Sequence, residues 1–173
     1  GNIIQSGLTF KKIVYTSTIL IYPNSAKKQN EKSRLKPAND YEKSKIDEEK
    51  LLTDFAKNSG NKLTIARLTN VYGDTKNRAL IHWILTALVS NNEFTINNEG
   101  KPVRDFIFVE DVSNYLTSLI LLDQKEVIEV YNVCTGMGHS INEIISKVQL
   151  ISGKKLKLQT GTQTDEKLRV IGD

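Results

Sequence analysis

Short β-branched runs alternate with longer helix-like stretches along this chain, and this alternation is what most narrows the folds it can adopt. Residues 12–18 (KIVYTST) predict a buried strand, and residues 62–67 (KLTIAR) predict a second one. Between them, residues 40–59 predict a helix that ends at Gly60. Strands that alternate with helices in this way predict an α/β fold with a largely parallel sheet.

The second half of the chain continues the alternation with shorter elements. We expect helices at residues 79–90, 111–122 and 140–151, and strands at residues 93–96, 105–109, 129–133 and 156–159. A capping box opens the last helix, because Ser140 can accept the amide of Glu143 and Glu143 can reach back. The cleaner alternation ends near Gly73. We therefore expect one part over residues 1–73 and a smaller, mixed α/β lobe over residues 74–173.

Composition and charge exclude several classes of protein. The 173 residues are 39% hydrophobic and 25% charged, which is typical of a globular chain that buries a core. The net charge of +4 is spread along the chain, so we expect no nucleic-acid partner. No apolar run approaches the roughly 20 residues of a membrane-spanning helix, and no secretory leader is visible. We therefore expect a cytoplasmic protein with no membrane partner.

The single cysteine and the two histidines limit the metal and redox chemistry. Cys134 alone cannot form an internal disulfide or a multi-cysteine zinc site, and it fits a reducing compartment. His82 and His139 have no ligand spacing to each other or to Cys134, so we expect no metal site.

Tyr41 and Lys45, in the sequence YEKSK, are spaced so that they lie on one face of the predicted helix. A lysine ammonium beside a phenol favours the phenolate and lowers the pKa of the phenol. A free tyrosine titrates near pH ~10, so it needs such help to act as a base at neutral pH. The alternative is an interfacial tyrosine beside a lysine whose aliphatic stem covers apolar surface, and the spacing alone favours that alternative.

Polar side chains at the ends of the predicted strands are candidates for the rest of a site. Residues 16–18 (Thr-Ser-Thr) end the first strand, and Asn70 follows the second. Ligands bind beyond the carboxyl ends of strands in open α/β sheets, although such hydroxyls can also simply cap the strand. Arg104, near the start of a later strand, could bind a phosphate through two parallel hydrogen bonds. Its alternative is a structural pair with Asp105.

Five motifs in this order resemble the extended short-chain dehydrogenase/reductase family. They are YTSTILIYP, YEKSK, ARLTNVYGD, VRDFIFVEDV and YNVCTG, and they run over nearly the whole chain. The best-known branch of the family is the NAD-dependent nucleotide-sugar epimerases and dehydratases. The resemblance implies an incomplete Rossmann-like doubly wound parallel sheet plus a small mixed α/β substrate-binding lobe. Residues 1–73 would then be the C-terminal part of the NAD(P)-binding Rossmann domain and carry the catalytic residues, and residues 74–173 would mainly form the substrate-binding lobe, with elements that return to the Rossmann domain. The resemblance also implies NAD or NADP as the cofactor, a nucleotide-sugar substrate and a homodimer.

The resemblance assigns catalytic and cofactor roles to particular residues. Tyr41 is similar to the family's catalytic base, and Lys45 is similar to its partner, which also binds the nicotinamide ribose. Thr18 matches the catalytic Ser/Thr that bonds the reacting sugar oxygen. Thr16 and Ser17 match the strand end beside the cofactor, so the resemblance implies that Thr16, Ser17, Tyr41 and Lys45 bind it.

Two more residues match the family's substrate contacts, but its dinucleotide loop has no match. Asn70 matches a position that contacts the substrate, and Arg104 matches one that binds its diphosphate. The family's glycine-rich loop lies several βα units before the tyrosine motif, whereas only 40 residues precede that motif here. The only Gly-x-Gly, Gly136 and Gly138, is interpreted as a helix-entry turn. The chain therefore resembles the C-terminal part of such an enzyme, and alone it should bind dinucleotide poorly and show little activity.

The residues after Thr18 favour one chemistry within the family. Dehydratases follow the catalytic threonine with an Asp-Glu pair that eliminates water, whereas Ile19 and Leu20 stand here. We therefore rank first an epimerase that acts by transient hydride transfer with Tyr41 as the base. A reductase or epimerase-reductase ranks second, because Tyr22-Pro23 resembles some deoxysugar epimerase-reductases. A truncated, non-catalytic binding domain is the alternative from another class, and the intact set of candidate catalytic residues argues against it.

Overall fold

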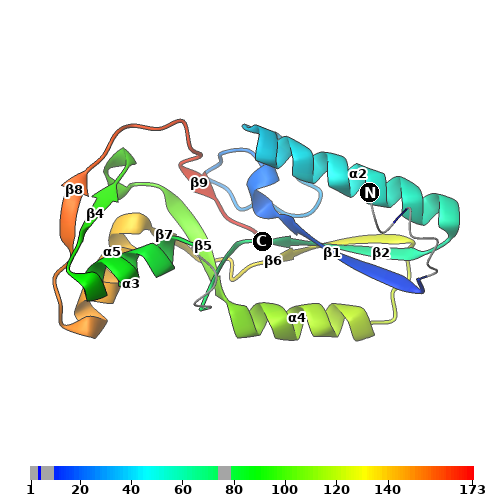
Figure 1. Cartoon of the computed structure of the whole chain (residues 1–173). Coiled ribbons are helices and arrows are strands. Elements are labelled where there is room, and N and C mark those ends of the chain that lie inside the picture. The colour runs from blue at the N-terminus through cyan, green and yellow to red at the C-terminus, as the bar shows by residue number, and fades with distance from the viewer. Residues whose placement is uncertain (1–3, 5–9, 74–78) are drawn as a thin grey trace.

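A parallel three-stranded sheet lies at the centre of the larger of two lobes in the computed structural model (Figure 1). The structure describes residue 4, residues 10–73 and residues 79–173. The strands, in spatial order, are β1 (Lys12–Thr18), β2 (Lys62–Leu68) and β6 (Ile128–Val133). The helices on its two faces are α2 (Asp40–Ser59) and α4 (Val109–Leu121). This is the parallel α/β arrangement that the alternating sequence predicts.

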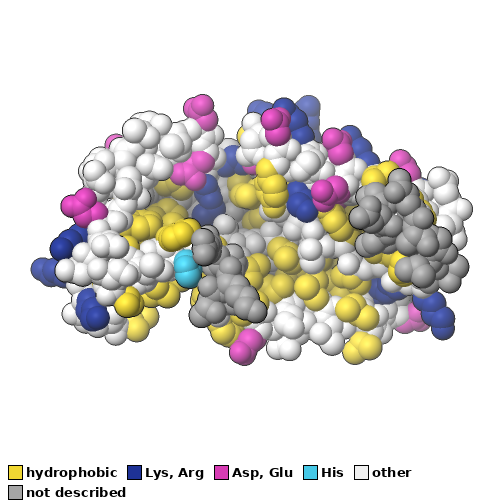
Figure 2. Space-filling view, in the orientation of Figure 1, with side chains coloured by type: hydrophobic (Ala, Val, Ile, Leu, Met, Phe, Trp, Pro, Cys, Tyr) yellow, Lys and Arg dark blue, Asp and Glu magenta, His cyan; other side chains and the backbone are white. Residues whose placement is uncertain are grey.

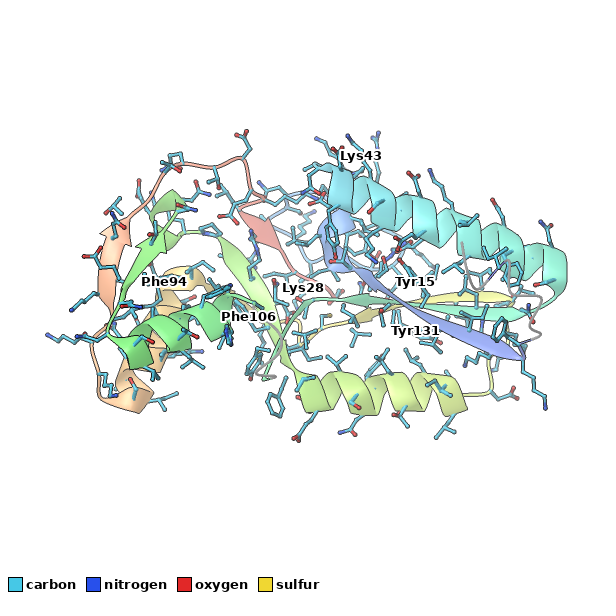
Figure 3. All side chains as sticks on the ribbon, in the orientation of Figure 1. Tyr15, Lys28, Lys43, Phe94, Phe106 and Tyr131 are labelled. Atoms are coloured by element: carbon cyan, nitrogen blue, oxygen red, sulfur yellow. The ribbon has the colours of Figure 1, made fainter. Side chains whose placement is uncertain are left out.

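The strands of this sheet are apolar because their side chains alternate between two buried layers. Leu63 packs with Ala56 of α2 on one face, and Ala66 belongs to the layer over α4 on the other. Tyr15 and Tyr131 are divided in the same way, the first under α2 and the second over α4 (Figure 3). Hydrophobic side chains also gather between the two helices over β1, the edge strand (Figure 2).

The bounds of α2 agree with the prediction because strong local signals mark both of its ends. Asn39 is the N-cap, and its side chain accepts the amide of Glu42 at 2.9 Å. Gly60 ends the helix in the left-handed conformation, with φ of 71°. This start places Tyr41 in the first helical turn. Among the described residues, no helix combines the length and the apolar content that a membrane crossing needs.

The smaller lobe is a mixed layer of two helices and a parallel pair of strands. Its elements are α3 (Leu80–Ser90), β4 (Glu93–Ile96), α5 (Ile141–Ser152) and β8 (Lys157–Thr160). Their apolar faces meet in one cluster that includes Ile84, Leu88 and Ile145. The predicted capping box is present at the start of α5, between Ser140 and Glu143.

A second sheet connects the two lobes, and three of its strands were not predicted. β5 (Val103–Phe108) pairs with β3 (Asn70–Tyr72), β7 (Gly138–Ser140) and β9 (Arg169–Val170). These partners have only two or three residues, too few to show a period in the sequence. β5 begins two residues before the predicted strand, and it ends at Phe108 because Val109 opens α4. Through β9 the C-terminal segment returns to the middle of the molecule (Figure 1).

A buried ion pair fastens α2 to the sheet. Arg67 Nε and Nη2 donate to the two carboxylate oxygens of Glu49 at 3.0 and 2.7 Å. The two side chains are only 6% and 7% exposed. Arg67 Nη1 also donates to the Tyr22 hydroxyl at 2.8 Å, and that hydroxyl donates to Asn132. Each charge therefore has the partners it needs away from water.

Glu49→Gln should lower the free energy of unfolding by about 3 kcal/mol, because the buried Arg67 guanidinium loses its counter-charge. The double variant Glu49→Leu/Arg67→Met should lose less, since neither side then carries a buried charge. Urea unfolding followed by circular dichroism measures both. A double variant less stable than Glu49→Gln would contradict this account of the pair.

Candidate active site

A cleft of about 370 Å³ opens at the carboxyl ends of β1 and β2. It brings together most of the site residues predicted from the sequence. Those that line it are Thr16, Ser17, Thr18, Tyr41, Lys45 and Asn70. Arg104 lies instead in an adjacent pocket of about 260 Å³, which Asn70 also lines. The predicted residues therefore occupy one continuous region of the structure.

Thr18 and Tyr41 reach the cleft from different elements. Thr18 is the last residue of β1, opposite Leu68 of β2, and only 8% of it is exposed. Its Oγ1 accepts the amide of Leu20 at 3.2 Å, so it caps the short helical turn η1 (Ile19–Ile21). The capping role considered for this residue is thus present, and in the described part of the chain its proton has no acceptor. Tyr41 is 54% exposed, so its phenol is open to a ligand.

Lys45 makes its polar contacts with Tyr15 and Glu48. Its Nζ donates to the Tyr15 hydroxyl at 3.1 Å and to Glu48 Oε2 at 3.0 Å, and within the described chain it makes no hydrogen bond to Tyr41. Tyr15 also donates to Glu48. Burial alone would lower the pKa of Lys45, but the hydrogen bonds to Glu48 and Tyr15 outweigh it and raise that pKa. A fixed cation therefore lines the cleft.

Tyr15 is the tyrosine that Lys45 touches, yet it is poorly suited to act as a base. Burial, followed by the hydrogen bond to Glu48, raises the pKa of Tyr15 to about 12. The same network lowers the pKa of Glu48, through hydrogen bonds from Tyr15 and Lys45. Neither Tyr15 nor Glu48 was singled out from the sequence. The available signal for Glu48 was its place one helical turn after Lys45.

Ser17 carries a buried hydroxyl that has no hydrogen-bond partner among the described residues. The residue is 5% exposed and lines the cleft. Buried polar groups in proteins are nearly always paired, so an unpaired one at a cleft is a ready contact for a ligand. This is the position that the resemblance places beside the cofactor.

Arg104 is held by an acidic residue that the sequence did not suggest. Its Nη2 donates to Glu166 Oε2 at 2.9 Å, and Nη1 donates to the carbonyl of Val103 at 3.0 Å. The sequence offered a structural ion pair between Arg104 and Asp105 as the alternative. Arg104 does form an ion pair, but its partner is Glu166 and not Asp105. Burial lowers the pKa of Arg104, and Glu166 opposes that effect. Since Glu166 is far away in the sequence, no local pattern could have revealed it.

Asp105 organises the turn that contains the Gly-x-Gly sequence. It is fully buried, and its carboxylate accepts the Thr135 amide, the Thr135 hydroxyl and the Gly136 amide at 3.1, 2.7 and 2.7 Å. Gly136 has φ of 71°, a conformation that glycine adopts without strain. Its amide is thus already bonded, which agrees with a helix-entry turn rather than a phosphate loop. The Asp105 carbonyl also accepts from Asn70 at 3.0 Å, which fixes Asn70 between the two pockets.

Comparison with known sequences gives one family match and several distant relatives. The sequence model of the NAD dependent epimerase/dehydratase family matches residues 4–134. The dTDP-D-glucose 4,6-dehydratase of Dictyostelium discoideum is 28% identical over 155 residues, covering 82% of this chain and 35% of that protein. An uncharacterized UDP-glucose epimerase of Bacillus subtilis (strain 168) is 26% identical over 152 residues, covering 87% of this chain and 48% of that protein. The chain thus spans less than half the length of these two relatives.

Solved structures share the fold over nearly the whole chain. The UDP-glucose 4-epimerase of Thermus thermophilus, in complex with NAD, has a TM-score of 0.86 and 25% identity, covering 98% of this chain and 57% of that one. The UDP-glucuronic acid 4-epimerase of Bacillus cereus, with UDP-glucuronic acid and NAD, has a TM-score of 0.92 and 22% identity, covering 99% and 56%. The likeness confirms the predicted Rossmann-like α/β fold.

Ser17→Ala should change the free energy of unfolding by less than about 0.5 kcal/mol or raise it, because its hydroxyl has no protein hydrogen bond to lose. The matched control is Thr64→Val on β2, where the buried hydroxyl donates to Gln124 at 2.9 Å. That change should cost about 1 kcal/mol, because it leaves the Gln124 oxygen unpaired. Urea unfolding compares the two. A loss at Ser17 equal to that at Thr64 would show that the Ser17 hydroxyl serves the fold.

Proposed function

The chain belongs to the NAD dependent epimerase/dehydratase family, and from this premise we propose that it is the catalytic and substrate-binding part of a nucleotide-sugar epimerase. The observation that carries the proposal is the single cleft shared by Thr18, Tyr41 and Lys45. In this proposal residues 1–73 supply the catalytic groups, and residues 74–173 mainly form the substrate-binding lobe. The length of the chain, about half that of its structural neighbours, agrees with a part of a larger enzyme.

Tyr41 is the proposed base, because its exposed side chain can meet a sugar hydroxyl and, as the tyrosinate, take its proton to become the phenol. Thr18 donates its free proton to the same sugar oxygen and holds it in place. Lys45 contributes a positive charge that favours the tyrosinate. In the free protein that charge is shared with Tyr15 and Glu48, so a bound ligand must draw it toward Tyr41.

The cleft fits the nicotinamide end of NAD. The unpaired hydroxyl of Ser17, the hydroxyl of Thr16 and the ammonium of Lys45 are the groups that would hold the nicotinamide and its ribose. When bound, NAD supplies the acceptor for a hydride from the sugar carbon and the donor that returns it. The turn at Gly136 does not offer a site for the dinucleotide phosphates, because the Gly136 amide already donates to the Asp105 carboxylate.

Epimerisation fits the cleft better than dehydration does. Eliminating water from the sugar needs an additional acid and base, and the two residues after Thr18 are aliphatic. Ile19 is only 1% exposed and packs with Tyr22 and Val170, so it belongs to the core. The reductase alternative gains no support from Tyr22, which is fully buried and bonded to Arg67.

The pocket beside the cleft is the proposed site of the substrate diphosphate. Arg104 supplies a planar, charged donor there, and such groups bind phosphate through two parallel hydrogen bonds. Asn70 borders both pockets, so a sugar attached to that diphosphate would extend into the cleft. Glu166 must release Arg104 for this to occur. The UDP-glucose epimerases of Bacillus subtilis and Thermus thermophilus, to which the chain is similar, support a UDP-sugar as the substrate.

Tyr41→Phe should reduce turnover at least about 100-fold, because the general base is lost, while the affinity for the sugar nucleotide stays nearly unchanged. The assay uses the product of the whole open reading frame that encodes this chain, adds NAD and a panel of UDP-sugars, and follows the epimeric product by NMR. Tyr131→Phe is the control, since this phenol bonds Glu129 outside the cleft. Normal turnover by Tyr41→Phe would refute the role of Tyr41. If the unsubstituted protein binds UDP-sugars without turning any over, the non-catalytic alternative holds.

Arg104→Met should weaken the binding of UDP to the 173-residue chain by about 10- to 100-fold, the usual effect of losing hydrogen bonds to a charged group. Calorimetric titration with UDP measures it. Lys101→Met is the matched control, because Lys101 is an exposed cation of the same lobe that pairs with Glu99. Equal affinities for Arg104→Met and the unsubstituted chain would place the diphosphate elsewhere.

A further inference from the structure

Lys167 is a buried cation in the C-terminal segment that reaches the N-terminal turn of α2. Its side chain is 8% exposed, and its Nζ donates to Glu42 Oε2 at 2.6 Å. The Glu42 side chain is only 4% exposed. These residues are 125 positions apart in the chain, so the contact ties the last part of the sequence to the helix that carries Tyr41.

The same ammonium binds the turn that follows Thr18. It donates to the carbonyl of Leu20, in the middle of η1, and at 2.7 Å to the carbonyl of Tyr22, the residue that ends η1. Thr18 itself accepts the Leu20 amide, so the turn and the Thr18 hydroxyl are bonded together. The Lys36 carbonyl, in the loop before α2, is a fourth acceptor at 3.3 Å and shares one of the three ammonium protons.

Glu42 connects Lys167 to the residues at the start of α2. Its carboxylate accepts the Ala38 amide at 2.6 Å and the Asn39 side chain at 3.2 Å, while its own amide donates to Asn39. The carboxylate thus closes the first turn of α2, and Tyr41 is the residue immediately before it. A single ammonium therefore contacts the residue after Tyr41 and the turn that begins after Thr18.

We propose that Lys167 is a positioning residue, which fixes the distance across the cleft between the Thr18 turn and the Tyr41 turn. Its effect on turnover rests on the proposed function, whereas its effect on the two turns does not. Burying an ammonium is unfavourable unless it is fully paired, and an apolar side chain in its place would leave the Glu42 carboxylate buried without a counter-charge. The acceptors from three separate segments explain why a cation stands here: it joins backbone carbonyls and a carboxylate that would otherwise repel one another.

The preceding residue extends this link to the diphosphate pocket. Glu166 binds Arg104 at 2.9 Å and accepts from Asn98 at 3.0 Å. Residues 166 and 167 therefore contact the proposed phosphate-binding arginine and the two catalytic turns in succession. Because the two residues are adjacent in the chain, they link the pocket that contains Arg104 to the two turns at the cleft.

The first test is hydrogen exchange in the 173-residue chain carrying Lys167→Met. The amides of Leu20, Tyr22, Glu42 and Lys43 should exchange at least about 10-fold faster relative to the amides of β2. The reason is that the two turns of the variant can open without first breaking the hydrogen bonds that the ammonium makes in the unsubstituted chain. Glu49→Gln is the control, since it removes a buried charge from the same helix and Glu49 itself contacts neither turn. Because its partner Arg67 also bonds the Tyr22 hydroxyl, the two variants are compared at Leu20, Glu42 and Lys43. Faster exchange spread evenly over the chain in both variants would overturn the proposal. If Lys167→Met does not fold, Glu42→Gln replaces it, because the amide oxygen can still accept the Ala38 amide while the negative charge that pairs with Lys167 is lost.

The second test is kinetic and uses the protein in which the role of Tyr41 is assayed. Lys167→Met should lower kcat by about 10- to 100-fold with KM changed little, because misplaced catalytic groups slow the chemical step more than they weaken binding. Lys167→Arg, which keeps the cation, should recover part of kcat. An unchanged kcat in Lys167→Met would overturn the catalytic consequence. Normal turnover by Tyr41→Phe would instead refute the proposed function and leave the exchange result to decide on the positioning of the turns.

Discussion

The parallel pairing of β1 with β2 is the interaction on which the rest of the structure depends. Two parallel strands cannot be joined by a tight turn, so the chain between them must cross one face of the sheet, here as α2. A helix that returns from the end of one strand to the start of the next begins at the carboxyl edge. Tyr41, in the first turn of α2, therefore lies at the same edge as Thr18. The cleft is a consequence of this connection, as in other open α/β sheets.

Buried charges join the elements around the cleft, and each has its partner on a different part of the chain. Arg67 of β2 binds Glu49 of α2, Lys167 binds Glu42, and the guanidinium of Arg104 binds Glu166. The pairs of Arg67 and of Lys167 compensate the desolvation of both ions, so removing one partner is costly, whereas the Glu166 side chain is 42% exposed and remains partly solvated. These ion pairs thus hold together segments that are distant in the sequence. Lys45 differs because it is only partly buried and also lines the cleft, where its charge is available to a ligand.

The larger elements could be predicted because their signals are local. The cap at Asn39 and the glycine at position 60 mark the ends of α2, and the β-branched runs mark β1 and β2. The short strands β3, β7 and β9 carry no such signal, because two or three residues adopt an extended conformation only when a neighbouring strand is present to pair with them. The candidate site followed the same rule. Thr18 and Tyr41 stand in motifs, whereas the partners Tyr15 and Glu166 come from distant segments.

The sequence by itself determined the class of fold, the ends of the main helix and the set of polar residues at the strand ends, because period, capping and turn chemistry act within a few residues. Only the tertiary structure decided which charges meet. It placed Lys45 against Tyr15 and Arg104 against Glu166, and it left the hydroxyl of Ser17 unpaired among the described residues. The physical reason is that an ion or hydroxyl removed from water takes whatever partner the packing of distant segments brings within hydrogen-bonding distance, and sequence separation does not limit that choice.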